Sequence, residues 1–261
     1  MRASIAPTQV LTAPAERRAP WRIAKGMSLS LRTLLARTFL PEPHELVEHY
    51  PHPAEQRADG WVHGIGLAAA LIGGLFLAAS SWMQGRFGAA TATSVYALCL
   101  IGMLSCSAVY NLTRPSPARR LLRRLDEAAI FFLIAGSCTP FTTQRFHGLE
   151  AVGMTAAIWV LAIAGAGAKV FVNGLSDRAW CFIYLAFAWG GALVMTPLIL
   201  SLSVGPLTLL AVGGVVYTLG VVFFLNPALR FRRAIWHGFV VAGAALHFAA
   251  VMLGVVLVSP A

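Results

Sequence analysis

The sequence predicts an all-α fold, a polytopic membrane protein built as a bundle of seven transmembrane helices with a cytoplasmic N-terminus. Three observations support this prediction: the composition, a series of long apolar runs, and the placement of the basic residues. Of the 261 residues, 58% are hydrophobic and only 11% are charged, which is unusual for a soluble domain. The basic residues fall in alternate connecting loops, as expected for a chain that crosses a membrane repeatedly.

Seven apolar runs are each close to the ~20 residues that a helix needs to cross ~30 Å of hydrocarbon. The third is the shortest. The runs are Gly60–Trp82, Ala89–Asn111, Glu127–Gln144, Glu150–Phe171, Ala179–Leu200, Gly205–Leu225 and Ala234–Val258.

The basic residues predict the orientation of these helices. Eighteen of the 20 Lys and Arg lie before the first run or in the loops after the second, fourth and sixth runs, whereas the opposite loops carry only Arg86 and Arg145. Basic loops are retained on the cytoplasmic side, so we expect the N-terminus inside and the C-terminus outside. The net charge of +10 then reflects topology and contact with anionic lipid. We expect membrane lipids and no nucleic acid as partners, and the sequence identifies no protein partner.

Residues 1–57 differ from the rest of the chain because they are basic and rich in proline. We expect a largely disordered cytoplasmic tail. Within it, apolar residues at helical spacing over 27–40 could form an amphipathic helix on the inner leaflet. The transmembrane domain is predicted to occupy residues 58–261.

Polar residues within or bordering the runs gather near the cytoplasmic ends of four helices, and such residues mark candidate sites in a membrane. Each has a local alternative as a helix cap or an interfacial side chain. His247 lies ~15 Å deeper and is predicted to be a hydrogen-bonded packing residue. The polar residues are Asp59, His63, Ser107, Tyr110, Asn111, Asp126, Glu127, Arg233 and His237. From them we predict one polar pocket that contains His63, Asn111, Asp126, Arg233 and His237.

Several ordered motifs at these residues resemble the hemolysin III branch of the progestin and adipoQ receptor family. They are Trp61-Val-His63-Gly-Ile-Gly66, Ser107-Ala-Val-Tyr110, Arg124-Leu-Asp126, Ile134-Ala-Gly136-Ser-Cys-Thr139-Pro140-Phe141 and Ile235-Trp236-His237-Gly-Phe239. The resemblance covers roughly residues 55 to 258. It implies a membrane-homeostasis protein of a bacterial inner (plasma) membrane, while the old family name implies cytolysis.

The resemblance also implies a cytoplasmic zinc site like that of alkaline ceramidases, in which three histidines hold the metal and an aspartate steadies its water. Two of the three histidine positions are occupied here by Asn111 and Arg233, which are poor zinc ligands. Only His237 and Asp126 remain if a metal binds, so zinc is doubtful. We instead predict an ion pair between Asp126 and Arg233, surrounded by Asn111 and His237. The family also prefers Asn where Asp59 stands.

Three functions stay open. The first is membrane lipid or fluidity homeostasis with a degenerate metal site. The second is a zinc-dependent lipid amide or ester hydrolase, in which His63 or another group replaces a missing ligand. The third is a pore-forming, cytolysin-like protein. Asp126 and Ser107 are the candidate catalytic residues, and Ser107, His237 and Asp126 have the residue types of a nucleophilic triad. The sequence identifies no lipid substrate and no oligomeric state.

Overall fold

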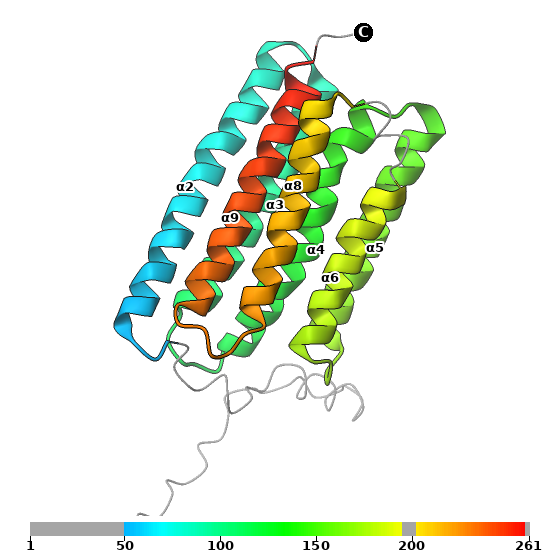
Figure 1. Ribbon diagram of the computed structural model, residues 1–261. Helices are drawn as coiled ribbons and strands as arrows, with labels where there is room; N and C mark the ends of the chain where they lie inside the picture. The colour runs from blue at the N-terminus through cyan, green and yellow to red at the C-terminus, as the bar shows by residue number, and fades with distance from the viewer. Residues whose placement is uncertain (1–49, 195–201, 259–261) are drawn as a thin grey trace, which may run out of the picture. The chain divides into compact units, whose positions relative to one another are not determined.

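The computed structural model describes residues 50–194 and 202–258. Within these residues the chain is all-helical, and seven α-helices run roughly alongside one another (Figure 1). They are α2 (Pro53–Met83), α3 (Phe87–Leu112), α4 (Arg119–Gln144), α5 (Gly148–Phe171), α6 (Asp177–Val194), α8 (Val204–Phe224) and α9 (Arg232–Val251), the last continuing into a π-helical turn, η2 (Met252–Val256). Residues 1–49 of the predicted tail, with its amphipathic helix at 27–40, lie outside the described residues. Residues 53–57, which we also assigned to the tail, form the start of α2.

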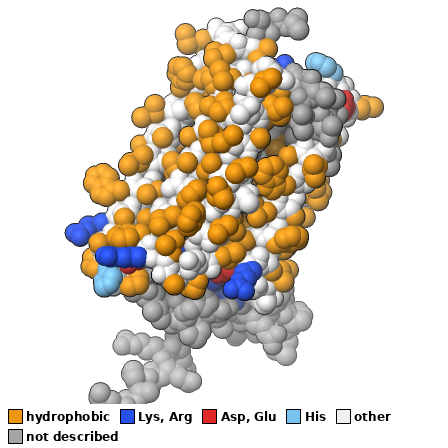
Figure 2. Space-filling model, viewed as in Figure 1, with side chains coloured by type: hydrophobic (Ala, Val, Ile, Leu, Met, Phe, Trp, Pro, Cys, Tyr) orange, Lys and Arg blue, Asp and Glu red, His pale blue; other side chains and the backbone are white. Residues whose placement is uncertain are grey.

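Six of these helices are long and apolar enough to cross a membrane, namely α2, α3, α4, α5, α8 and the continuous α9–η2 segment. The helix α6 is not among the six, and the end of the corresponding predicted run falls at residues outside those described. Large apolar side chains face outward: Trp61, Ile72 and Leu75 of α2 are 71–72% exposed. Hydrophobic side chains cover the visible face in Figure 2 along its length. Such a surface would be unfavourable in water, and the chain is an integral membrane protein.

The helix α4 begins two turns before the predicted position, at Arg119 rather than Glu127. Charged residues in the first turns hid this start from a hydropathy pattern. Their side chains have local partners: Arg124 donates to the carbonyl oxygens of Lys169 and Val170, near the end of α5, and Arg120 donates to the Asn173 side chain. Arginines can therefore be buried at the end of this helix because the end of the neighbouring helix supplies acceptors.

Small residues bring the helices into close contact. A Cβ atom added to Gly136 of α4 would lie 2.7 Å from the Cβ atom of Cys99 on α3. A Cβ atom added to Gly66 of α2 would lie 2.6 Å from a methyl carbon of Val241 on α9. Close backbone approach at small residues is the usual means of packing helices in a membrane. It places α2, α3, α4 and α9 near enough to share one polar site.

Arg86 and Arg145 are the two basic residues in the loops that we predict to face away from the cytoplasm. They lie at the end of the bundle where α9–η2 finishes, opposite to the end where Arg233 begins α9. There, Arg86 Nη1 donates to the carbonyl oxygens of Val255 (2.8 Å) and Val256 (3.0 Å). Arg145 donates to the carbonyl oxygen of Gly254 from Nε (2.9 Å) and Nη2 (2.7 Å). The last carbonyls of a helix have no partner within the helix, so these arginines cap the end of α9–η2.

Candidate functional site

The helix α2 supplies two buried ionisable residues, Asp59 and His63, one helical turn apart on the same face. The Asp59 side chain is fully buried and accepts a 2.5 Å hydrogen bond from the Tyr50 hydroxyl. Burial and the adjacent Asp59 carboxylate raise the pKa of Tyr50 well above its ordinary value, so this hydroxyl stays a donor. The sequence marked Asp59 as polar at this membrane face but did not place it in the pocket.

The helix α9 brings His237 between α2 and α3. Its Nδ1 lies 2.6 Å from Asp59 Oδ1, and its Nε2 lies 3.4 Å from Ser107 Oγ. The His63 ring lies beside it, with the ring centroids 4.3 Å apart. His63 Nε2 is buried and has no hydrogen-bond partner in the described part of the chain, although Asp59 Oδ2 is 3.5 Å away. Both nitrogens of His237 are therefore directed at named groups on two other helices.

The helix α3 adds Ser107 and Asn111, again one turn apart and both buried. The Asn111 amide nitrogen lies 3.0 Å from the Ser107 carbonyl oxygen and 3.4 Å from Ser107 Oγ. The amide oxygen of Asn111 accepts a 2.6 Å hydrogen bond from Arg233 Nη1. A hydrogen-bonded chain thus runs from the guanidinium through the amide to the serine.

The five residues predicted to form a polar pocket all line one cavity: His63, Asn111, Asp126, Arg233 and His237. Within it, the Asp126 carboxylate accepts a hydrogen bond from the Ser107 side chain, and the ion pairs among the described residues do not join it to Arg233. The guanidinium donates to Asn111, so the direct Asp126–Arg233 ion pair that we predicted is not formed, although Arg233 lies close enough to interact electrostatically with Asp126. The sequence pattern predicted which residues lie at the helix ends but not the directions of their side chains. It therefore could not show that Asn111 lies nearer to Arg233 than Asp126 does.

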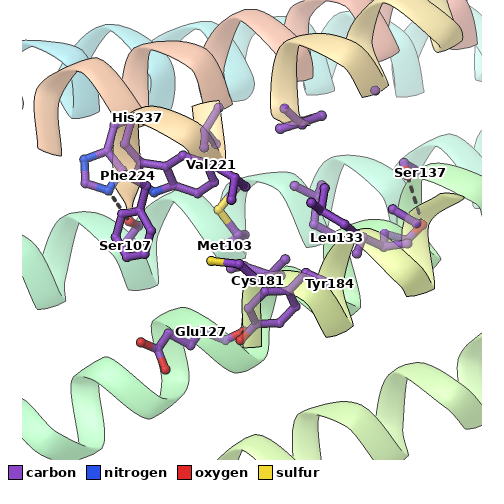
Figure 3. Close-up of a pocket in the computed structure, with 18 of the residues that line it drawn as sticks. Met103, Ser107, Glu127, Leu133, Ser137, Cys181, Tyr184, Val221, Phe224 and His237 are labelled. Carbon is purple, nitrogen blue, oxygen red and sulfur yellow. Dashed lines mark hydrogen bonds between the residues drawn. The ribbon is translucent and has the colours of Figure 1, made fainter. Parts of the chain in front are cut away.

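A cavity of about 1160 Å³ opens beside these residues. Ser107 and His237 lie at one end of it, and apolar side chains such as Met103, Leu133 and Val221 form its walls (Figure 3). The lining comes from α3, α4, α6, α8 and α9, with His63 from α2. An apolar cavity with a few converging polar groups is the usual form of a ligand site.

A second polar cluster, which the sequence did not predict, joins α4, α5 and α6. Arg123 lies 2.9 Å from the Glu127 carboxylate and 2.7 Å from that of Asp177, and Lys169 forms an ion pair with Glu127. Only the spacing of four between Arg123 and Glu127 indicated one of these pairs in advance. The opposite charges are matched within this cluster, so we assign it a structural role.

His247, predicted to be a packing residue, lies deeper in the bundle. Its ring packs edge-on against Tyr217, with centroids 5.4 Å apart, and contacts Gly213. Its Nε2 has no hydrogen-bond partner within 50–194 and 202–258. The packing is confirmed, and the predicted hydrogen bond is made to the Leu210 main chain and not by Nε2.

Comparison with known proteins places the chain in a family. A family model described as "Haemolysin-III related" matches residues 53–248. The chain belongs to this family. The "Hemolysin-3" of Bacillus cereus is similar to it at 31% identity, over 76% of this chain and 90% of that protein. The "Hemolysin-3 homolog" of Bacillus subtilis is 28% identical over 76% of this chain and 93% of its own length.

A mammalian relative extends the similarity beyond bacteria. The human "Monocyte to macrophage differentiation factor" is 28% identical over 75% of this chain and 70% of that protein. Such mammalian relatives are of the progestin and adipoQ receptor type. The hemolysin III branch predicted from the motifs is thereby confirmed.

The metal set implied by the family does not fit this haemolysin-III-related protein. Two of its positions hold Asn111 and Arg233, which bond to each other, and a guanidinium has no lone pair to donate to a metal. A different buried group could hold a metal ion, because ligand atoms of Asp59, His63 and His237 all lie within 4.8 Å of one another. This group shares only His237 with the implied set.

Proposed function

We propose that the protein binds a membrane lipid in its cavity and acts in membrane lipid homeostasis without the metal centre that the family resemblance implies. The observation that supports this proposal is a mainly apolar cavity of about 1160 Å³ inside a membrane-embedded bundle. Toward one end it is lined by Ser107 and His237 and by charged residues of the helix ends such as Arg233. Its size exceeds the ~300–1,000 Å³ of pockets for drug-sized ligands. A lipid matches both the apolar walls and the polar end.

The site belongs in the cytoplasmic half of an inner (plasma) membrane in this proposal. Arg233, at the start of α9, lies at the same end of the bundle as the site. Basic residues gather on the cytoplasmic side of membrane proteins, so the N-terminus would be inside. A lipid headgroup would then reach Ser107 and His237 from the inner leaflet.

Native mass spectrometry of the protein released from detergent tests lipid binding. We expect bound lipid in the unmodified protein and at least about a tenfold loss of occupancy in Leu133→Trp, equivalent to ~1.4 kcal/mol, because Leu133 lines the cavity. Leu161→Trp is the matched control, since Leu161 is 58% exposed on α5 and is not among the lining residues. Equal lipid in both variants would refute the proposal.

Dye-loaded vesicles containing the protein separate lipid binding from pore formation. The printed name of the Bacillus cereus relative, "Hemolysin-3", motivates this measurement. The cavity walls are mainly apolar and offer little to solvate an ion, so we expect no dye release. Release at protein-to-lipid ratios that leave control vesicles intact would support a pore instead.

A metal-dependent hydrolase is the second candidate, favoured by the buried Asp59, His63 and His237 group. A metal there would polarise a lipid carbonyl and activate water. Elemental analysis of the purified protein distinguishes it: one metal per chain that is lost in His63→Ala and retained in His52→Ala would establish this candidate. His52 is exposed before α2 and serves as the control.

A further inference from the structure

Three side chains from different helices lie in a row: Ser107 of α3 contacts His237 of α9, which contacts Asp59 of α2. This is the arrangement of nucleophile, base and acid in a nucleophilic triad. We infer that Ser107 is an acyl-accepting nucleophile, with His237 as its general base and Asp59 as the group that orients the base. The substrate class is a lipid with an acyl ester or amide bond, bound with its chain in the apolar cavity. This inference rests on the lipid binding proposed above and adds a reaction to it.

The geometry assigns each nitrogen of His237 one role. Nδ1 lies 2.6 Å from Asp59 Oδ1, and a carboxylate at that distance favours a proton on Nδ1. Nε2 then presents its lone pair to Ser107 Oγ at 3.4 Å, and the Asp126 carboxylate is a second acceptor for the Ser107 hydroxyl. That distance is long for a hydrogen bond, but such contacts commonly shorten when substrate binds. Ser107 and His237 both border the cavity, as Figure 3 shows.

Asp59 is held in the position that this role requires. Its side chain is fully buried, and Tyr50 donates to Oδ2 while His237 faces Oδ1. The two oxygens thus have separate partners, and the carboxylate cannot rotate without losing both. The sequence placed Asp126 in the orienting role, and the structure places Asp59 against His237 instead.

Asn111 and Arg233 supply a donor beside the nucleophile. A guanidinium has only N–H donors, so the bond from Arg233 requires the amide oxygen of Asn111 to face it. The amide N–H₂ group is thereby directed at Ser107, with its nitrogen 3.0 Å from the carbonyl oxygen and 3.4 Å from Oγ. A donor fixed there can stabilise negative charge on a substrate oxygen. The same two substitutions that remove metal ligands therefore build a polar environment suited to acyl transfer.

The reaction balances with water as the only co-reactant. Ser107 Oγ bonds to the acyl carbon while its proton passes to His237 Nε2. The bond from the acyl carbon to the leaving oxygen or nitrogen then breaks, and His237 returns the proton to the leaving group. Water, deprotonated by His237, attacks the acyl-serine; the bond to Oγ breaks, Ser107 regains its proton, and a fatty acid leaves.

The test is covalent labelling of the full-length protein in detergent with an alkyl fluorophosphonate probe. An activated serine displaces fluoride and forms a stable bond to phosphorus. We expect labelling that peptide mapping assigns to Ser107, absent in Ser107→Ala and unaffected by chelator. Ser81→Ala is the matched control and should label normally, because Ser81 is a buried serine of α2 that bonds the Leu77 carbonyl oxygen and is not among the residues that line the cavity.

The isosteric variant Asp59→Asn tests the triad rather than the fold. We expect at least about a hundredfold slower labelling, because loss of the orienting carboxylate costs ~10⁴ in a serine protease triad. Size-exclusion chromatography and lipid content show whether this variant is folded. Unlabelled Ser107 in folded, lipid-bound protein would overturn the triad and leave lipid binding intact, whereas loss of both signals would refute both. Labelling that a chelator abolishes would also overturn the triad, because it would assign His237 to a metal.

Discussion

The two ends of the bundle use arginine in different ways. At one end, Arg233 donates to the Asn111 side chain, which in turn faces Ser107. At the other, Arg86 and Arg145 donate to main-chain carbonyl oxygens at the end of α9–η2. The charge is the same at both ends and the acceptor differs. Side-chain acceptors can vary with function, whereas terminal carbonyls are present in every helix and need a partner.

The presence of an arginine in this protein therefore does not by itself distinguish a functional site from a helix cap; the acceptor to which it donates does. Around Arg233 the neighbouring polar atoms belong to the side chains of the proposed site, and they border a cavity. Around Arg145 the acceptor is the carbonyl oxygen of Gly254, which offers no chemistry. Changes at the first end should alter the proposed reaction, the stability or both, and changes at the second should alter stability alone.

The largest effect is expected from Asp59→Ala. It leaves the Tyr50 hydroxyl and His237 Nδ1 without their buried acceptor, and each unsatisfied group costs ~1–3 kcal/mol. We expect a loss of about 3 kcal/mol in the free energy of unfolding, measured in detergent, together with loss of probe labelling. Asp177→Ala is the control on a half-exposed carboxylate; an equal loss there would show that burial of Asp59 is not the cause.

Arg145→Met should give the next largest change, confined to the far end. It removes two hydrogen bonds to the Gly254 carbonyl oxygen, and we expect a loss of about 2 kcal/mol. Hydrogen exchange should accelerate in η2, while lipid content and labelling of Ser107 stay unchanged. A change in labelling would show that the two ends of the bundle do not act independently.

Much of the fold could be predicted because a membrane imposes length and hydrophobicity on each helix. The start of α4 could not, since its arginines are buried by bonds to Val170 and Asn173 that involve a different helix. Within the site, the positions of Ser107 and His237 along their helices correctly predicted that they lie at the same depth in the membrane. The sequence could not predict which carboxylate faces His237. That depends on how each helix is rotated about its axis and on the close packing of Gly66 against α9, and the positions of the helix ends in the sequence give no information on either.

Arg233→Lys should have a smaller effect, on reaction more than on stability. Lysine keeps the charge but loses the planar fork that fixes the Asn111 amide, so the amide can turn away from Ser107. We expect labelling to slow about tenfold, equivalent to ~1.4 kcal/mol, with little change in unfolding. Arg232→Lys, at a neighbouring residue that lies over the Phe224 ring, is the matched control and should label at the normal rate.

Tyr50→Phe should have the smallest effect, and its pH dependence identifies the cause. The variant loses one hydrogen bond to Asp59, which is worth about 1 kcal/mol near neutral pH. The pKa of Tyr50 is raised in the folded protein, whereas in the unfolded chain it is ~10. The stability that Tyr50 contributes is therefore fully present below pH ~10 and is lost as the pH rises further, because only the unfolded chain then releases the proton.

The difference in unfolding free energy between the unmodified protein and Tyr50→Phe isolates this group from the other titrating residues. It should stay constant from neutral pH to about 10 and then fall by about 1.4 kcal/mol per pH unit, so that the two proteins become equally stable within roughly one unit. A difference that does not change with pH would mean that the Tyr50 hydroxyl is not buried against Asp59. The Asp59 carboxylate would then be exposed to solvent next to Tyr50. The two ends of the bundle would in that case differ only in whether their arginines donate to side-chain or to main-chain acceptors.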